Sequence, residues 1–435
     1  MQPSFAAVRA TLGALSICLA ASASLAADAT SPAFGPADWR QYRGTPTRNA
    51  VFPAGAATPP MPAAFDTGAA ISATPVVSAG QLYIGTTDGP LSGTLYAFDF
   101  ASSQPRWTVK LPNQTMSDMV AAAGTIYVGF GNRDFASRTV RGTGESGVLA
   151  VSARTGQIVW TFKTAGEVMP TPVVSHGVVY IATGDGTLYA LDARSGTLDW
   201  SLRLPGWDSM SSPALDDAHL YIGSSDSFVA VNLPRRAIAW MFRDRASFTD
   251  VSPAVDRDAT GRRVIVTTGV KGADRLTREE RATYAMDPDQ AAHFIYAFDE
   301  SGILVWKDLL GQGPSQDDNT AGAPAIADGR VFVGSPYTLA VYAYDLTTGR
   351  QLWRTSVGTG VKGAPAIAGG RVYVGDMRGR LHVLDEATGR ELATLQLSGK
   401  PLAPAGPVIV GGTLFMSSQD GRVYARSIDE LAAVR

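Results

Sequence analysis

The chain has 435 residues, of which 46 are glycine and 17% are charged, and its formal net charge is -2 at pH 7. Such a balanced charge gives no reason to expect binding to nucleic acid or to an anionic membrane surface. The single cysteine, Cys18, lies near the N-terminus, so the rest of the chain offers no thiolate for a disulfide, a metal site or a nucleophile.

The first 26 residues have the pattern of a secretory signal peptide. Arg9 is the only charge before Asp28, residues 11–21 are apolar, and small residues follow in ASASLAA. The apolar run is shorter than the ~20 residues that a membrane-spanning helix needs. We therefore expect cleavage after Ala26 and an exported protein, periplasmic or secreted, with no membrane span.

The next part of the chain repeats one unit. The tryptophans that close successive units are Trp107, Trp160, Trp200, Trp240, Trp306 and Trp353, and Ala393 takes this place in a seventh unit. Each unit opens with a small-Pro-apolar step such as TPVV or APAI, and alternating apolar runs between Gly/Asp turns follow. This pattern predicts four short antiparallel strands per unit, which is one blade of a β-propeller.

Counting units predicts the domain organisation. Residues 71–399 hold seven complete units and residues 400–428 supply only three strands, so the N-terminal PMPAAFDTG is expected to add the missing outer strand. The prediction is a signal peptide at 1–26, an N-terminal segment at 27–60, one all-β, eight-bladed propeller of four-stranded antiparallel blades at 61–429, and a tail at 430–435. Insertions are expected at about 132–146 and 271–293, and LTREERA in the second predicts a short helix.

The stretches ALDARSGTLDW and AYDLTTGRQLW share the pattern A-x-D-x-x-T/S-G-x-x-x-W. This pattern resembles the tryptophan-docking repeat of the PQQ-like (pyrroloquinoline-quinone repeat) β-propeller family, and WRQYRGTPTRNAVF resembles a segment common at the start of such proteins. The resemblance covers roughly residues 39–428. It implies the fold and not a cofactor, because the tryptophans belong to outer strands that dock one blade on the next.

Residues just before each small-Pro step are expected to line the mouth of the central channel. Aligning the units places on one arc Glu167, Asp208, Asp250, Asp318, Asn319 and Lys362, with Gln114 at the matching position of the second unit. Convergent carboxylates beside a lysine form a site that shifts pKa values and binds a polar or anionic ligand. A solvated rim of ordinary loop carboxylates explains the same residues.

The loop GPSQDDNTAGAP is the most specific part of this arc. Asp317, Asp318 and Asn319 lead directly toward the predicted channel, where a general base or a ligand for a hard cation is chemically reasonable. An Asx turn before a strand explains them nearly as well. The candidate catalytic residues are Asp318, Asp317 and Asp250.

The resemblance implies three functions that the sequence leaves open. Export, repeat number and length favour a binding or scaffold propeller, like the PQQ-like subunit of outer-membrane protein assembly, with an envelope protein or a small polar ligand as partner. A quinoprotein dehydrogenase would hold PQQ and calcium through Glu167, Asn319, Asp318 or Asp250, and Lys362. The chain lacks the adjacent Cys–Cys pair of the large alcohol-oxidising members. A cofactor-free hydrolase resembling tetrathionate hydrolases would use Asp318 as base and Lys362 to anchor an anion.

Overall fold

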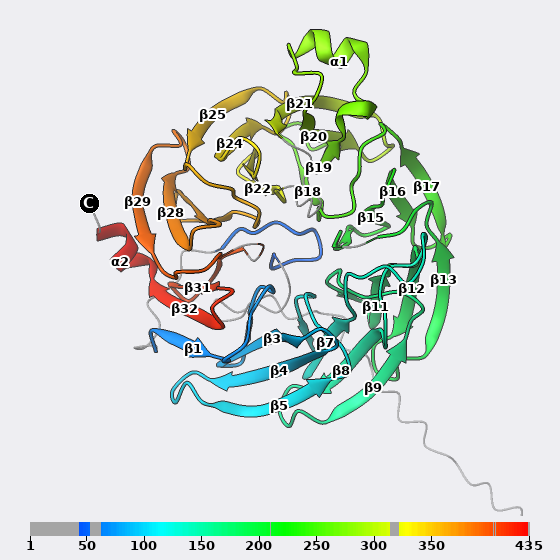
Figure 1. The fold of residues 1–435 in the computed structure, drawn as a ribbon, viewed down its shortest axis with the longest axis vertical. Helices are drawn as coiled ribbons and strands as arrows, with labels where there is room; N and C mark the ends of the chain where they lie inside the picture. The colour runs from blue at the N-terminus through cyan, green and yellow to red at the C-terminus, as the bar shows by residue number, and fades with distance from the viewer. Residues whose placement is uncertain are drawn as a thin grey trace, which may run out of the picture. The chain divides into compact units, whose positions relative to one another are not determined.

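Thirty-two strands build eight four-stranded antiparallel sheets, which stand around a common axis as the blades of a propeller (Figure 1). The computed structural model describes residues 43–52, 62–208, 210–313, 322–402, 404 and 406–433, which belong to one unit, Pro36–Arg435. The predicted eight-bladed propeller is confirmed.

Within each blade the strands run outward from the axis in chain order. Blades 1 to 4 are β2 (Val76–Ser78), β3 (Gln81–Gly89), β4 (Ser92–Asp99) and β5 (Pro105–Leu111); β6 (Val120–Ala122), β7 (Thr125–Phe130), β8 (Gly147–Ser152) and β9 (Ile158–Lys163); β10 (Val173–Ser175), β11 (Val178–Ala182), β12 (Thr187–Asp192) and β13 (Leu198–Arg203); and β14 (Ala214–Leu215), β15 (His219–Gly223), β16 (Phe228–Asn232) and β17 (Ala237–Phe242).

Blades 5 to 8 follow the same order, except that the last takes its outer strand from the N-terminal part. They are β18 (Ala254–Arg257), β19 (Arg263–Lys271), β20 (Ala291–Asp299) and β21 (Leu304–Gly313); β22 (Ala325–Ala327), β23 (Arg330–Ser335), β24 (Ala340–Asp345) and β25 (Gln351–Ser356); β26 (Ala366–Ala368), β27 (Arg371–Gly375), β28 (Arg380–Asp385) and β29 (Glu391–Gln396); and β30 (Val408–Val410), β31 (Thr413–Ser417), β32 (Arg422–Ser427) and β1 (Ala64–Asp66).

The ring closes in the eighth blade as predicted. β1 pairs antiparallel with β32, with Ala64 opposite Tyr424. The C-terminal end differs from the expected tail at 430–435, because α2 (Ile428–Ala433) begins directly after β32. Leu431 is 2% exposed and packs in the core of the last blades, which explains why the chain continues as a helix here.

Tryptophans dock neighbouring blades, as the repeat pattern predicts. The indole N–H groups of Trp107, Trp160, Trp240, Trp306 and Trp353 each donate to a backbone carbonyl of the next blade, on Ala153, Ala193, Glu300, Leu346 and Glu386, at 2.9–3.0 Å. A glycine of that blade lies under each ring; for example, a Cβ at Gly196 would lie 2.5 Å from the Trp160 ring. The packing of a tryptophan of one blade on a glycine of the next therefore has a structural role.

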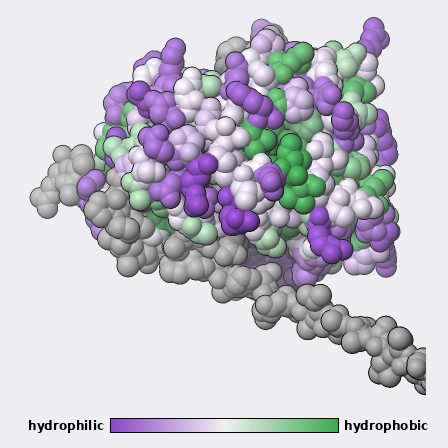
Figure 2. Space-filling model, turned by 90° about the horizontal axis from the view of Figure 1, so that it is seen from below, coloured by the Kyte–Doolittle hydropathy of each residue, from purple (hydrophilic) through white to green (hydrophobic). Residues whose placement is uncertain are grey.

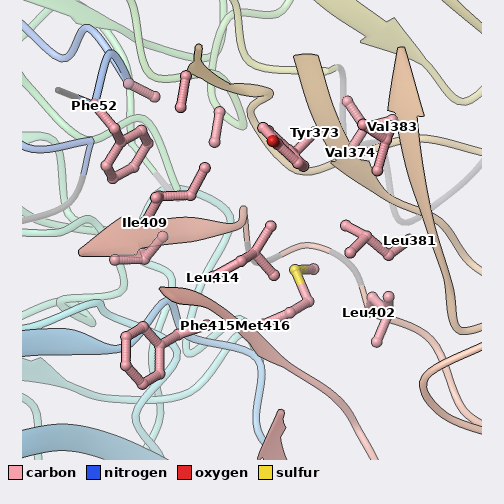
Figure 3. Close-up of a cluster of buried hydrophobic side chains, with 14 of the residues drawn as sticks. Phe52, Tyr373, Val374, Leu381, Val383, Leu402, Ile409, Leu414, Phe415 and Met416 are labelled. Atoms are coloured by element: carbon pink, nitrogen blue, oxygen red, sulfur yellow. The ribbon is translucent and has the colours of Figure 1, made fainter. Parts of the chain in front are cut away.

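The core lies between the blades. Figure 3 shows the cluster around blades 7 and 8, which includes Tyr373, Leu381, Met416 and, from the N-terminal segment, Phe52. All four are less than 5% exposed. On the wall of the ring, apolar residues are interspersed among polar ones (Figure 2). Among the exposed apolar residues is Ile158 of β9, at 53% exposure.

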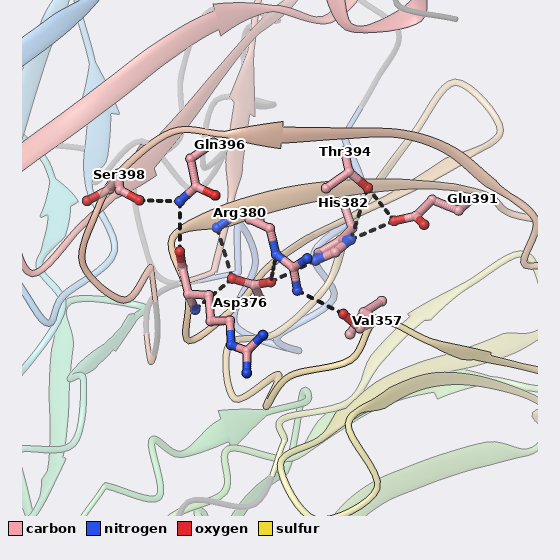
Figure 4. A network of polar contacts seen from close by, with 9 residues as sticks. Val357, Asp376, Arg380, His382, Glu391, Thr394, Gln396 and Ser398 are labelled. Atoms are coloured by element: carbon pink, nitrogen blue, oxygen red, sulfur yellow. Dashed lines mark hydrogen bonds and ion pairs between the residues drawn. The ribbon is translucent and has the colours of Figure 1, made fainter.

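Turns between the second and third strands are stabilised by a buried aspartate. Asp376 accepts hydrogen bonds from Arg380 Nε at 2.8 Å and from the backbone N–H of the same residue at 2.9 Å (Figure 4). His382 lies between two carboxylates, with Nε2 2.9 Å from Asp376 and Nδ1 2.6 Å from Glu391. Both ring nitrogens of His382 thus have hydrogen-bond partners within the same blade, so this histidine has a structural role.

The innermost strands are joined near their start by a series of hydrogen bonds. In blades 2 to 5 the residue at the small position of the small-Pro step, which is Asp118 in blade 2, accepts a hydrogen bond through its side-chain oxygen from a backbone N–H of the preceding blade. The four bonds run from the N–H of Thr74 to Asp118, of Asp118 to Thr171, of Thr171 to Ser212 and of Ser212 to Ser252. In blades 6 to 8 the same position is Ala323, Ala364 and Gly406, which have no such oxygen. At this position the side chains carry an oxygen in blades 2 to 5, which we call the polar arc, and none in blades 6 to 8, which we call the smooth arc.

The larger insertion contains the predicted helix, α1 (Arg278–Thr283), after a short 3-10 turn, η1 (Ala273–Arg275). Thr277 and Glu280 form a capping box. The Glu280 carboxylate also lies 2.5 Å from the ammonium groups of both Lys271 and Lys307. Burial opposes ionisation of Glu280, but these two lysines outweigh it and lower its pKa to about 2. The insertion is therefore anchored by charge to blade 5.

Candidate functional site

Strand direction places both insertions on one face. Because strands alternate within a blade, the first strand begins at the end of the ring where the second strand ends and the third begins. The insertions at 132–146 and 271–293 both connect second and third strands, so they share this face with the residues that precede the small-Pro steps. We call it the mouth face. In Figure 1, α1 projects outward from the rim.

Glu167 lies on the approach to blade 3 and is 0% exposed. Its Oε2 accepts a hydrogen bond from the Met169 backbone N–H at 2.7 Å. A Cβ at Gly131 or Gly142 would lie within 3 Å of its side chain, so these two glycines allow the backbone to close around the carboxyl group. Burial raises its pKa well above the ordinary value, against the opposing effect of Arg141.

Arg141 comes from the smaller insertion and covers Glu167. Its Nε lies 3.8 Å from Glu167 Oε1, and its backbone carbonyl accepts the Glu167 N–H at 2.8 Å. The guanidinium lies 5.6 Å from the Phe135 ring centre and 5.7 Å from that of Trp207. Its side chain is 16% exposed, and its buried Nε has no hydrogen-bond partner among the residues that the structure describes. Arg141 is therefore a cation held against two aromatic rings and one buried carboxyl group.

Asp250 precedes blade 5, and its charge acts on ionisable groups that belong to two other blades. Its negative charge adds to burial in raising the pKa of Glu167, before blade 3, and that of Tyr337, on blade 6. A Cβ at Gly313 would lie 2.4 Å from the Tyr337 ring, so glycine is required where β21 ends against this turn. The charge of Asp250 thus acts on Glu167, and the predicted grouping of the two residues in one site stays a prediction.

His293 is a buried polar residue beside this group. It is 0% exposed, its Nδ1 lies 3.3 Å from Ser335 Oγ, and its ring centre lies 5.9 Å from that of Tyr337. Burial lowers its pKa to about 3, so the imidazole is neutral at physiological pH.

The N-terminal segment crosses the middle of the ring (Figure 1) and binds the innermost strands. Arg43 donates to the Ser252 carbonyl at 3.0 Å, and Arg48 donates to the Pro213 carbonyl at 2.9 Å and to the Pro172 carbonyl at 3.1 Å. Both arginines are at most 2% exposed. Residues 43–52 thus hold blades 3, 4 and 5 together from the axis.

Asp118 is the acidic member of the polar arc. It is 7% exposed and accepts hydrogen bonds from the Thr74 N–H and from Thr171 Oγ1. Burial raises its pKa to about 7, although these hydrogen bonds and the nearby charge of Arg48 act in the opposite direction.

The remaining predicted site residues are not all part of this group. Gln114 is bound to the turn between β3 and β4, where its amide donates to the carbonyls of Gly89 and Pro90. Asp208 is 0% exposed, and Lys362 is half-buried on the approach to β26. Asp317, Asp318 and Asn319 lie outside the residues that the structure describes.

Glu167 does not fit as a calcium ligand. One oxygen is bound by a backbone N–H, the other faces the Arg141 cation, and burial favours the protonated carboxyl group. A hard cation needs ionised or carbonyl oxygens that it can reach. The described residues likewise include no cluster of three His, Cys, Asp or Glu side chains that could hold a metal ion. The donor set at Glu167 is therefore unsuited to the calcium that accompanies PQQ in the quinoprotein hypothesis.

Fold and sequence comparison agree on the class of protein. A PQQ-like repeat family, PQQ_2, described as outer membrane protein assembly factor BamB, matches residues 144–278 and 291–430, more than half of the chain. The chain belongs to this family. No helix among the described residues is long and apolar enough to cross a membrane.

Two curated relatives match most of the chain. It is 26% identical over 437 residues to the tetrathionate hydrolase of Acidithiobacillus ferrooxidans, covering 88% of this chain and 84% of that protein. It is 27% identical over 366 residues to BamB of Burkholderia pseudomallei, covering 81% and 83% respectively.

Solved structures share the architecture. BamB of Moraxella catarrhalis superposes with a TM-score of 0.57 at 20% identity, covering 80% of this chain and 91% of that one. A quinohemoprotein alcohol dehydrogenase of Pseudomonas putida superposes with a TM-score of 0.67 at 15% identity, covering 92% and 81%. At these identities the likeness establishes the fold alone.

Proposed function

We propose that this protein binds a small sulfur-containing dianion at its mouth face and hydrolyses it, with tetrathionate as the first substrate to test. The observation that carries the proposal is the Arg141 guanidinium, which lies against the contacting rings of Phe135 and Trp207 and whose Nε has no hydrogen-bond partner among the described residues. A guanidinium fork matches the paired oxygens of an anionic group such as a sulfonate.

The state of Glu167 supports anion binding. Because burial favours its neutral form, Glu167 does not fully cancel the charge of Arg141, which lies 3.8 Å away. Lys362 is proposed as a second anchor for the anion. The relative named tetrathionate hydrolase, which aligns over 88% of the chain, supports the choice of substrate.

Asp318 is proposed as the general base, with Asp317 and Asp250 as the alternative carboxylates. It takes a proton from a water whose oxygen bonds to one inner sulfur of tetrathionate while the central S–S bond breaks, so that thiosulfate leaves as the dianion and the other half leaves as HO–S–SO3−. Asp318→Asn removes the base while keeping size and hydrogen-bonding capacity, so thiosulfate release from tetrathionate should fall at least ~100-fold. Asp317→Asn tests the neighbouring carboxylate in the same assay. Asp274→Asn, an exposed residue of η1, is the control and should retain wild-type activity.

A second candidate function is a scaffold role in the cell envelope, which the BamB family match favours. Under this hypothesis the protein binds an envelope protein and has no turnover. Crosslinking in envelope preparations, followed by purification, tests it. A reproducible partner together with no thiosulfate release would favour the scaffold, whereas turnover without a partner would favour the hydrolase.

We also propose that the chain is exported and works in the periplasm or outside the cell. The signal-like pattern of residues 1–26 and the family match support this location. N-terminal sequencing of protein recovered from the periplasm should begin at Ala27, since cleavage is expected after Ala26.

A further inference from the structure

Blade 4 departs from the turn that blades 2, 3, 6 and 7 share. In blade 3 the turn before the outer strand reads Ala193-Arg194-Ser195-Gly196, whereas the matching turn of blade 4 reads Leu233-Pro234-Arg235-Arg236. Arg236 therefore occupies the glycine position, and it adopts the left-handed conformation, with φ of 53°. This conformation is unfavourable for a residue with a side chain.

The altered turn changes a hydrogen bond between blades. In blade 3 the Gly196 N–H donates to the Asp192 carbonyl, but in blade 4 the Arg236 N–H donates to the Leu233 carbonyl at 3.2 Å. By position, Leu233 is the residue whose carbonyl should accept the indole N–H of Trp200. The indole N–H of Trp200 makes no hydrogen bond within the described part of the chain, unlike the indole N–H groups of its five counterparts.

A pocket of about 300 Å³ lies at this interface. Trp200 and Tyr180 form an aromatic wall, with ring centres 6.0 Å apart, and the altered turn forms the other side. The pocket is bordered by turns between first and second strands and between third and fourth strands. Since these turns lie at the end of the ring opposite the mouth face, the pocket is separate from the site proposed above.

The charged residues of the pocket are mainly acidic. Asp199 lies 3.3 Å from Arg236, and Asp216 lies 3.0 Å from Arg263. Asp217 is a further carboxylate, 98% exposed, with its nearest cation, Arg263, 3.6 Å away. The three carboxylates outnumber these two guanidinium groups, so the pocket favours a cationic group.

We propose that this pocket binds a basic peptide segment through one arginine or lysine and the peptide carbonyl beside it. In the sister blades the indole donates to a backbone carbonyl, so a peptide carbonyl is the acceptor that Trp200 lacks. The aromatic wall and Asp217 then receive the basic side chain, through cation–π and charge interactions. The pocket volume suits one long side chain, and the segment belongs to a partner protein.

The experiment is calorimetric titration of the whole protein with N-acetyl-Gly-Arg-Gly-amide and with its Glu counterpart. We expect binding of the Arg peptide at least ~10-fold tighter than that of the Glu peptide. Asp217→Asn should weaken it ~5-fold, and Trp200→Phe, which removes the N–H donor, should weaken it by a similar factor. Asp274→Asn is the control and should leave it unchanged.

A turn exchange provides the decisive variant. L233A/P234R/R235S/R236G installs the blade 3 turn, which should restore the indole hydrogen bond, close the pocket and abolish peptide binding while the fold is preserved. Unchanged binding by this variant, no binding by the wild type, or equal binding of free guanidinium ion and the Arg peptide would each overturn the proposal. Because the mouth residues are untouched, tetrathionate turnover reports on the proposed function separately.

Discussion

The two arcs of the inner ring differ by one side chain per blade, and the chemistry of the molecule follows this difference. In blades 2 to 5, Asp118, Thr171, Ser212 and Ser252 carry oxygens that link neighbouring blades. In blades 6 to 8 the corresponding residues are alanine or glycine. Both arcs belong to the same ring, so the ring does not need such an oxygen in every blade.

The polar arc is also where charged residues meet. Arg48 binds carbonyls of blades 3 and 4, and Glu167 with Arg141 lies above the same blades. The repeated residues of the blades build the ring, whereas Arg48, Glu167 and Arg141 lie at positions that the repeat units do not share. Variants that make the two arcs alike, or remove one contact of the polar arc, test this account.

The largest effect is expected for Arg48→Met. This substitution leaves the carbonyls of Pro172 and Pro213 without their donor and removes the cation near Asp118. We expect the free energy of unfolding to fall by about 3–5 kcal/mol, measured by chemical denaturation. Arg138→Met, at an exposed position of the smaller insertion, should change it by less than ~0.5 kcal/mol. Equal effects of the two substitutions would contradict a structural role for the N-terminal segment.

Asp118→Thr, which installs the residue of the next blade, should change the pH dependence of stability. The pKa of Asp118 is about 7 in the folded protein and 3.8 in the unfolded chain. Between these values the folded state keeps a proton that the unfolded chain releases, so wild-type stability decreases as pH rises, by up to ~1.4 kcal/mol per pH unit. The variant should lack this contribution in denaturation curves recorded from pH 4 to 8. Parallel curves for both proteins would show that Asp118 does not titrate in this range.

Glu280→Gln should loosen the larger insertion. The neutral amide no longer pairs with the ammonium groups of Lys271 and Lys307, so we expect a loss of about 1–2 kcal/mol and faster proteolysis within residues 272–290. Glu279→Gln lies on the same helix turn but is exposed, and it serves as the matched control. If both variants are cleaved at the same rate, the charge network does not anchor the insertion.

The smallest effect is expected on the smooth arc. Ala323→Ser places an oxygen where it can accept the Ser252 backbone N–H, which would extend the hydrogen-bonded series by one blade. The gain should be about 0.5–1 kcal/mol, and hydrogen exchange of the segment containing Ser252 should become slower. Exchange as fast as in the wild type would show that the backbone of blade 6 does not bring the new hydroxyl within reach.

Repeat spacing was sufficient to predict the fold, including the N-terminal strand β1 that completes the last blade. A repeat unit contains its own strands and turns, so they can be recognised from a short stretch of sequence. Aligning the units also placed Glu167 and Asp250 on one arc of the predicted mouth. It did not predict burial of Glu167, because that depends on Gly131, Gly142 and the fold of the smaller insertion.

Other contacts of the site have no local signal. Arg43 and Arg48 bind carbonyls more than 120 positions away, and a carbonyl has no sequence signature. Asp118 could have been found, since it stands alone as an acid among Thr and Ser at the aligned position. Arg141 was visible as one of several arginines in an insertion, but its aromatic neighbour Trp207 comes from the next blade interface.

The most direct test is steady-state hydrolysis of tetrathionate by the wild type, by Arg141→Gln and by Arg138→Gln, an exposed arginine of the same insertion. If Arg141 anchors the anion, the wild type releases thiosulfate, Arg141→Gln raises KM at least ~10-fold, and Arg138→Gln matches the wild type. No release by the wild type, or the same KM for both variants, would contradict the assignment of the mouth face as an anion-hydrolysing site.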